Sequence, residues 1–139
     1  MAPAASAEDI EKWEERWHIK MPVDIKRMYM SFDGFCLFKR DDPRYKLIAL
    51  KSLMPTRDKM YLGQSDCGVE NMLALFELYD GNFVALHIDT LYEYGYALID
   101  AFHETFWREW KHPRVISRSL FEFLSEAIAA PNEYFWLCR

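Results

Sequence analysis

The feature that most constrains this fold is a pair of amphipathic segments within residues 10–35. In the first segment, Ile10, Trp13 and Trp17 follow the i, i+3, i+7 spacing that places side chains on one face of a helix. The second segment repeats the same period after Pro22, a residue that suits the first position of a helix. The pattern therefore predicts two packed helices at the start of the chain.

Beyond Asp33-Gly34 the apolar period changes from that of a helix to the period of 2 that is typical of strands. The strongest hairpin signal is Asp80-Gly81-Asn82, which joins two almost continuously apolar arms at residues 72–79 and 83–88. We predict that these arms form a central strand pair covered on both faces. Other strands are predicted at residues 35–39, 45–50 and 96–102, with a short helical turn and loop at 51–65 and either strand or helix at 103–111.

Serine residues are predicted to cap the first and last helices. Ser6 lies three residues before Asp9, and Ser119 lies three residues before Glu122, as in a capping box. We predict that the last helix buries a stripe flanked by Phe121 and Phe123. The residues of that stripe are Leu120, Leu124, Ala127 and Ile128.

These segments predict an α+β fold, with an N-terminal helix pair, a central mainly antiparallel sheet and a C-terminal helix. At 139 residues the chain has the length of one ordinary domain, so we expect a single domain over residues 1–139. Residues 1–5 are small and are expected to form a flexible tail.

Composition narrows the class of function. The net charge is −5 and no basic stripe is visible, so a nucleic-acid partner is not expected. Aromatic residues make up 17% of the chain, which is more than a core of this size usually holds, so some should lie on a binding surface. An acidic surface also suits a basic protein partner, such as a nuclease domain.

The cysteine pattern and the start of the chain favour a cytoplasmic protein. Three cysteines without a C-x-x-C pair suggest neither a disulfide framework nor a zinc site, so reduced thiols are expected. The first ten residues lack the features of a signal peptide. No apolar stretch reaches the roughly 18–20 residues that span a bilayer, so no membrane partner is expected.

No catalytic or metal-binding constellation stands out. His103-Glu104 begins like a zinc-binding H-E-x-x-H motif, but Trp107 occupies the position of the second histidine. Cys67 could pair with a histidine, although a loop cysteine is more often inert. Asp41-Asp42 could act as paired carboxylates, although a solvated turn is the simpler interpretation. We therefore predict a binding protein that is not an enzyme and that needs no metal or cofactor.

The candidate binding residues combine charge or aromatic character with a position in a loop. The most informative segment is Tyr92-Glu93-Tyr94-Gly95, which lies between two predicted strands and interleaves aromatic and acidic side chains. The alternative is that this loop simply packs on its own sheet. The complete set of predicted protein-binding residues is Asp33, Asp41, Asp42, Asp89, Tyr92, Glu93 and Tyr94.

The opening of the chain resembles the SUKH superfamily, which includes bacterial toxin-immunity proteins and a fungal cell-wall-assembly regulator. The resemblance depends on Trp13-Glu14, on Met21-Pro22-x-Asp24, on Tyr29 and on Asp33-Gly34-Phe35. It implies a non-catalytic module that binds proteins. In the bacterial branch it implies an immunity protein that binds and blocks the toxic domain of a cognate toxin.

A second resemblance implies the same fold with a different role. Together with Lys26 and Phe76-Glu77-Leu78, these motifs are also similar to the non-catalytic subunit 2 of the tubulin polyglutamylase complex, which is longer than this chain. In that case the chain would be an assembly subunit, and its partner would be a modifying enzyme instead of a toxin.

Overall fold

The computed structural model describes residues 3–38, 44–61, 72–79, 81–102 and 114–138. Within them, six antiparallel strands form one sheet in the order β1-β2-β3-β4-β5-β6, so strands that follow each other in sequence are neighbours in space. The strands are β1 (Phe35–Cys36), β2 (Lys46–Leu47), β3 (Met72–Glu77), β4 (Phe83–Tyr92), β5 (Gly95–Ala101) and β6 (Val115–Ser117).

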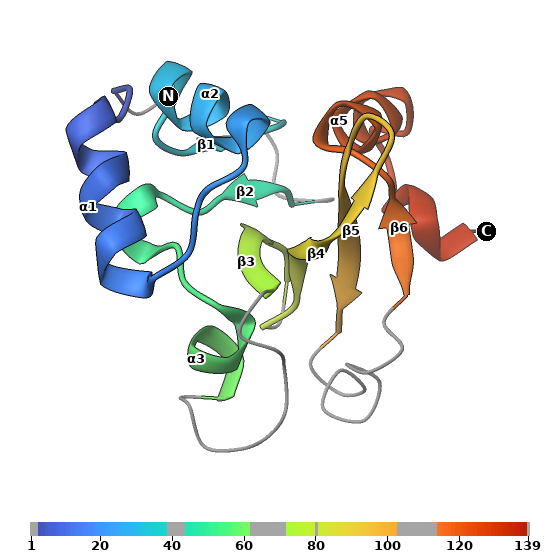
Figure 1. The fold of residues 1–139 in the computed structure, drawn as a ribbon. Helices are drawn as coiled ribbons and strands as arrows, with labels where there is room; N and C mark the ends of the chain where they lie inside the picture. Colours follow the sequence, from blue (N-terminus) through green and yellow to red (C-terminus); the bar gives the residue numbers. More distant parts are fainter. Residues whose placement is uncertain (1–2, 39–43, 62–71, 80, 103–113, 139) are drawn as a thin grey trace.

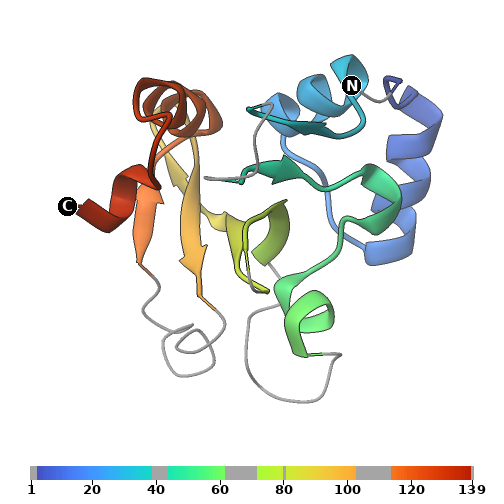
Figure 2. The same ribbon diagram turned by 180° about the vertical axis from the view of Figure 1, so that it is seen from behind.

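Helices lie at both ends of this sheet. The first two, α1 and α2, lie on one side of the molecule, and α5 and η2 lie on the other (Figures 1 and 2). The helical segments are α1 (Ala7–Trp17), α2 (Val23–Ser31), η1 (Leu50–Ser52), α3 (Thr56–Tyr61), α5 (Leu120–Ala129) and η2 (Phe135–Cys138). The predicted single α+β domain, with its N-terminal helix pair, antiparallel sheet and C-terminal helix, is confirmed.

The N-terminal cap forms as its sequence predicts. Ser6 Oγ accepts a hydrogen bond from the Asp9 amide, and the Asp9 carboxylate accepts one from the Ser6 amide. Ahead of the cap, the Ala5 amide donates to the Tyr29 carbonyl at 2.8 Å, and Ala5 itself is buried. Residues 3–5 therefore lie against α2, because a short apolar segment gains burial and backbone hydrogen bonds there, whereas residues 1–2 of the predicted tail lie outside the described residues.

Two side chains of the helix pair donate hydrogen bonds to the segment that follows β2. Trp13 Nε1 donates to the Leu53 carbonyl at 2.8 Å, and the Tyr29 hydroxyl donates to the Ile48 carbonyl at 2.6 Å. Burial raises the pKa of Tyr29 well above its ordinary value, so the hydroxyl keeps its proton and remains a donor. These contacts fasten the helix pair to the sheet.

The two central strands are apolar on both faces, as predicted. In β3 every residue from Met72 to Phe76 is buried, and the first four residues of β4 are also buried. β4 continues beyond the predicted end at residue 88, up to Tyr92, where it pairs with the start of β5. No sequence pattern predicts β6, because its three residues form a strand through pairing with β5.

Other predicted segments differ in length or fall outside the described residues. β1 and β2 contain two residues each, which is shorter than the predicted strands. The predicted helical turn in residues 51–65 corresponds to two short helices, η1 and α3. The segment at 103–111, which the sequence left open between strand and helix, lies outside the described residues.

The core-facing stripe of α5 differs from the predicted one. Leu120, Phe123 and Ala127 are buried, whereas Ile128 is exposed. The prediction was wrong about Phe123, which belongs to the core because its ring packs against aromatic side chains that are distant in sequence. Its ring centroid lies 5.2 Å from that of Phe76 and 5.8 Å from that of Tyr45.

Candidate protein-binding surface

The end of the β4–β5 hairpin packs closely against two helix N-termini. A Cβ atom added to Gly95 would lie only 2.9 Å from Cβ of Ser119, the N-cap of α5, and 3.6 Å from a carboxylate oxygen of Asp24 in the first turn of α2. A side chain at this position would therefore force the backbones apart. Glycine allows the hairpin, α5 and α2 to meet at one point.

A second contact orients the hairpin next to this junction. The guanidinium carbon of Arg118 lies 5.3 Å from the ring centroid of Tyr92, a distance typical of a cation–π contact. Ser119 then caps α5 by accepting a hydrogen bond from the Glu122 amide at 3.0 Å, as its sequence predicts. The capped start of α5 and the preceding Arg118 therefore contact the base of the hairpin end.

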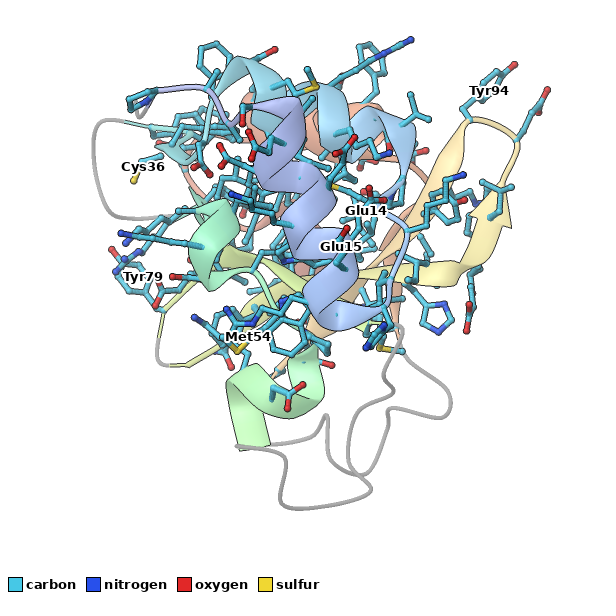
Figure 3. The ribbon with its side chains drawn as sticks, turned by 60° about the vertical axis from the view of Figure 1, so that its left-hand side comes forward. Glu14, Glu15, Cys36, Met54, Tyr79 and Tyr94 are labelled. Carbon is cyan, nitrogen blue, oxygen red and sulfur yellow. The ribbon has the colours of Figure 1, made fainter. Side chains whose placement is uncertain are left out.

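Large apolar side chains lie exposed around this junction. Tyr94, in the turn of the hairpin, and Phe121, in the first turn of α5, are each 82% exposed. Figure 3 shows the Tyr94 side chain at the end of the hairpin, pointing away from the body of the molecule. We refer to these exposed side chains and their polar neighbours as the hairpin-end surface, which consists of Val23, Leu91, Tyr92, Glu93, Tyr94, Arg118 and Phe121.

Exposed aromatic residues of this kind are the usual energetic anchors of protein interfaces. A tyrosine or phenylalanine buries a large area on binding and loses little side-chain entropy. Carboxylates accompany the aromatic side chains here, with Glu93 in the turn and Asp24 and Glu122 in the first turns of α2 and α5. The arrangement suits a protein partner that presents apolar pockets and positive charge.

The structure brings together three of the predicted binding residues and separates one. Tyr92, Glu93 and Tyr94 share the hairpin end, and Asp89 lies exposed on the same strand, β4. Asp33 lies elsewhere, between α2 and β1, where Oδ1 accepts a hydrogen bond from the Leu50 amide at 2.7 Å. The remaining two, Asp41 and Asp42, lie outside the described residues.

Sequence reasoning missed the residues that α2 and α5 contribute to this surface. The sequence pattern predicts Phe121 and Phe123 alike on the flanks of a buried stripe, whereas Phe123 is buried in the core and Phe121 is exposed. Val23 and Arg118 carried no signal, since each gains its position from the packing of a helix start against the hairpin. Phe121 carried one signal of surface exposure, because it is an apolar residue beyond those that the core-facing stripe of α5 needs.

A separate cavity of about 410 Å³ lies beside η2 and contains titratable side chains. Asp100, Arg114 and Tyr134 line it, and the Arg114 guanidinium donates a hydrogen bond to the Trp136 carbonyl. Its described lining includes no serine, threonine, cysteine or histidine, the side chains that most often serve as nucleophile or base. The described lining therefore supplies no nucleophile–histidine pair.

Neither a metal cluster nor a membrane helix occurs in the described part of the chain. No three histidine, cysteine or acidic side chains among the described residues are grouped so that they could hold a metal ion. No helix within the described ranges is both long and apolar enough to cross a membrane.

Comparison with known protein families gives a match over most of the chain. The model of the SMI1 / KNR4 family (SUKH-1) matches residues 4–126, which is most of the chain and includes both N-terminal helices, the sheet and most of α5. No curated protein matches the chain significantly.

Proposed function

The chain belongs to the SMI1 / KNR4 family (SUKH-1), and we propose that it is an immunity protein that binds and neutralises a cognate toxin domain. The family supports an immunity-type or regulatory domain without catalytic activity. Neutralisation of a toxin goes beyond this family role and is our proposal. A cytoplasmic location is part of it, because the exposed free thiol of Cys36 suits a reducing compartment.

The hairpin-end surface is the observation that carries this proposal. Tyr94 and Phe121 are large, almost fully exposed, and placed beside a junction that Gly95 and Ser119 hold closely packed. A rigid surface of this kind binds without a large ordering cost, because its side chains are presented by packed elements. We propose that the two aromatic side chains insert into the toxin domain and block access to its active site.

The charge of the chain supports a basic partner. A net charge of −5 and the carboxylates of Asp89 and Glu93 would attract a positively charged toxin, such as a nuclease domain, and raise the association rate. Inhibition by occlusion requires no chemistry from the chain, in keeping with a family of binding modules.

The proposal is tested first by identifying the partner. A tagged copy of the chain is purified from its native organism, and the proteins that co-elute are identified by mass spectrometry. We expect a polypeptide with a toxin domain in stoichiometric amount, and co-expression of the chain should restore growth of cells that produce the toxin. Recovery of a modifying-enzyme assembly would instead support the role of an assembly subunit, and failure to restore growth would contradict the immunity assignment.

The surface itself is tested by substitution. The double variant Tyr94→Ser, Phe121→Ser should lose protection against the recovered toxin while keeping its stability, because both side chains are exposed. Met30→Ser is the matched control, since Met30 is also an exposed apolar residue but lies on α2, outside the hairpin-end surface. Full protection by the double variant would move the interface elsewhere.

A further inference from the structure

A second surface, beside α1, gathers basic side chains at its rim. A groove of about 350 Å³ runs between α1, the turn after α2 and η1. Lys12 and Arg16 line it from α1, and Lys51 lines it from η1. All three residues are exposed, so this groove has a basic rim in a chain whose net charge is −5.

The two carboxylates of the groove are already engaged by backbone amides. Asp9 Oδ2 accepts a hydrogen bond from the Ser6 amide at 3.0 Å, and Asp33 Oδ1 accepts one from the Leu50 amide at 2.7 Å. The hydrogen bonds from Ser6 also lower the pKa of Asp9, so this carboxylate stays ionised in its capping role. These carboxylates hold the walls of the groove together. The cations make exposed contacts of their own, because Lys12 Nζ lies 3.3 Å from Glu8 Oε1 and the Arg16 guanidinium carbon lies 5.0 Å from the Trp17 ring centroid. A carboxylate of a ligand can replace Glu8 at Lys12, since an exposed ion pair of this kind contributes little to stability.

The rest of the lining is a firmly packed wall. Trp13 and Leu50 line the groove and are each only 5% exposed, so they are firmly packed. The Trp13 ring is fixed by its hydrogen bond to the Leu53 carbonyl, and Leu50 begins η1. The groove therefore combines a preformed wall with cations from two different elements, which is typical of a binding site.

The groove and the hairpin-end surface lie in different parts of the molecule. In Figure 3, η1 lies beside α1 on the side away from Tyr94. No residue of the hairpin-end surface lines the groove. A partner held at the hairpin end would therefore leave the groove open to a second contact.

We propose that this groove is a docking site for an acidic segment of a protein partner. Charge complementarity identifies the ligand: carboxylates of the segment would pair with Lys12, Arg16 and Lys51, the arginine being able to bind one of them bidentately. A protein segment is favoured over a nucleic acid, because the acidic remainder of the chain repels an extended polyphosphate and a short segment avoids that repulsion.

The test measures binding of a fluorescein-labelled peptide of alternating aspartate and glutamate by fluorescence anisotropy, with the full chain in low-salt buffer. We expect binding that weakens as salt is added. The variant Lys12→Glu, Lys51→Glu should weaken it by at least about fivefold, since each lost exposed ion pair contributes up to roughly fivefold and the reversed charges add repulsion. The neutral variant Lys12→Gln, Lys51→Gln provides a second measurement if the reversed one does not fold.

The matched control is Lys20→Glu, Arg27→Glu, which changes the net charge equally at two exposed positions outside the groove. It should retain peptide binding within about twofold, because only screened long-range charge changes. Equal losses in the groove and control variants, or no binding by the unmodified chain, would overturn the proposal. If a short oligothymidine displaced the labelled peptide at a lower concentration than unlabelled peptide does, the groove would be assigned to nucleic acid. That result would overturn the proposal as well.

Discussion

At the scale of single residues, the N-terminal motif of the chain performs an architectural role. Trp13 and Tyr29 donate to main-chain carbonyls of residues 48–53, and Asp33 accepts from an amide in the same segment. Glu14 accepts from the Met21 amide and thereby joins α1 to the start of α2. These side chains therefore join the helix pair to the rest of the scaffold.

Replacement of Glu14 by alanine should destabilise the chain. Glu14 Oε2 accepts a hydrogen bond from the amide of buried Met21 at 2.8 Å, and Oε1 lies 3.6 Å from Lys26 Nζ. Without the carboxylate, the amide loses its partner in a partly buried site, at a cost of about 1–3 kcal/mol in the free energy of unfolding. Urea denaturation followed by circular dichroism measures this change.

The neighbouring residue offers a matched control. Glu15 lies next to Glu14 on α1 but is exposed, and both are labelled in Figure 3. Glu15→Ala should change the free energy of unfolding by less than about 0.5 kcal/mol. Equal effects of the two substitutions would mean that the Glu14 hydrogen bond does not stabilise the helix pair.

Stability should fall in mildly acidic solution because of His87. Partial burial lowers the pKa of His87 below its ordinary value of 6.5, although Asp89 opposes this effect, and Nδ1 lies 2.6 Å from Thr90 Oγ1. The unfolded chain therefore takes up the proton first as the pH falls. The stabilising contribution of neutral His87 is present above pH 6.5 and is lost as the pH falls from there toward the folded-state pKa.

The substitution His87→Gln should reduce this pH dependence. The free energy of unfolding of both proteins is measured by urea denaturation between about pH 5 and pH 7.5, on either side of the ordinary histidine pKa. A slope that is the same with and without His87 would contradict the assignment.

At the scale of elements, the hairpin of β4 and β5 meets two helix starts at one glycine. α5 packs against β5 and β6 through Leu120, Phe123 and Ala127, while Phe121 points outward. The position of the exposed aromatic side chains therefore depends on the junction at Gly95, where strand and helix backbones approach each other closely.

Gly95→Ala should separate these elements. The new methyl group would lie 2.9 Å from Ser119 Cβ, which is too close for two carbon atoms, so the hairpin end must shift. We expect a loss of about 1–3 kcal/mol in the free energy of unfolding, measured by urea denaturation. We also expect weaker binding of the toxin, because the hairpin-end surface would be distorted.

Gly81→Asn is the comparison for this junction. Gly81 has a φ of +76°, and a Cβ atom there would meet nothing within 4 Å. Asparagine tolerates a positive φ, so the change should cost less than about 0.5 kcal/mol. If Gly95→Ala were as well tolerated, the close packing at Ser119 would not determine the geometry of the surface.

At the scale of the whole molecule, the core closes around aromatic side chains from both ends of the sheet. The ring of Trp136, near the C-terminus, lies 6.1 Å from Tyr45 and 6.1 Å from Phe123 between centroids. Trp136 is almost fully buried, although it lies beyond the part of the chain that the family model matches. The scaffold is therefore a single packed unit that presents charge and aromatic side chains at its surface.

The net charge should act on the rate of association with a basic toxin. Removing two carboxylates in Asp89→Ala, Glu93→Ala should slow association several-fold at low salt and have a smaller effect at high salt, because added ions screen the attraction. Stopped-flow mixing with the recovered toxin measures these rates. Glu11→Ala, Glu15→Ala removes the same charge from exposed positions on α1 and should have the smaller effect. A larger effect of Glu11→Ala, Glu15→Ala than of Asp89→Ala, Glu93→Ala on the association rate would place the interface near α1.

The sequence by itself determined most of the local structure. Spacing, caps and turn residues predicted both N-terminal helices, the hairpin around Gly81 and the start of the last helix at Ser119, because these features depend on neighbouring residues. It also predicted that Tyr92, Glu93 and Tyr94 would be found together, since they are consecutive.

Only the tertiary structure decided what depends on contacts between distant segments. The addition of β6 to the sheet requires pairing with β5, and the choice of Phe123 over Ile128 for the core requires the rings of Tyr45 and Phe76. The position of Phe121 beside the hairpin also depends on a contact between distant segments, the close approach of Gly95 and Ser119. Burial and close packing between distant residues select these arrangements, and no local pattern in the sequence records them.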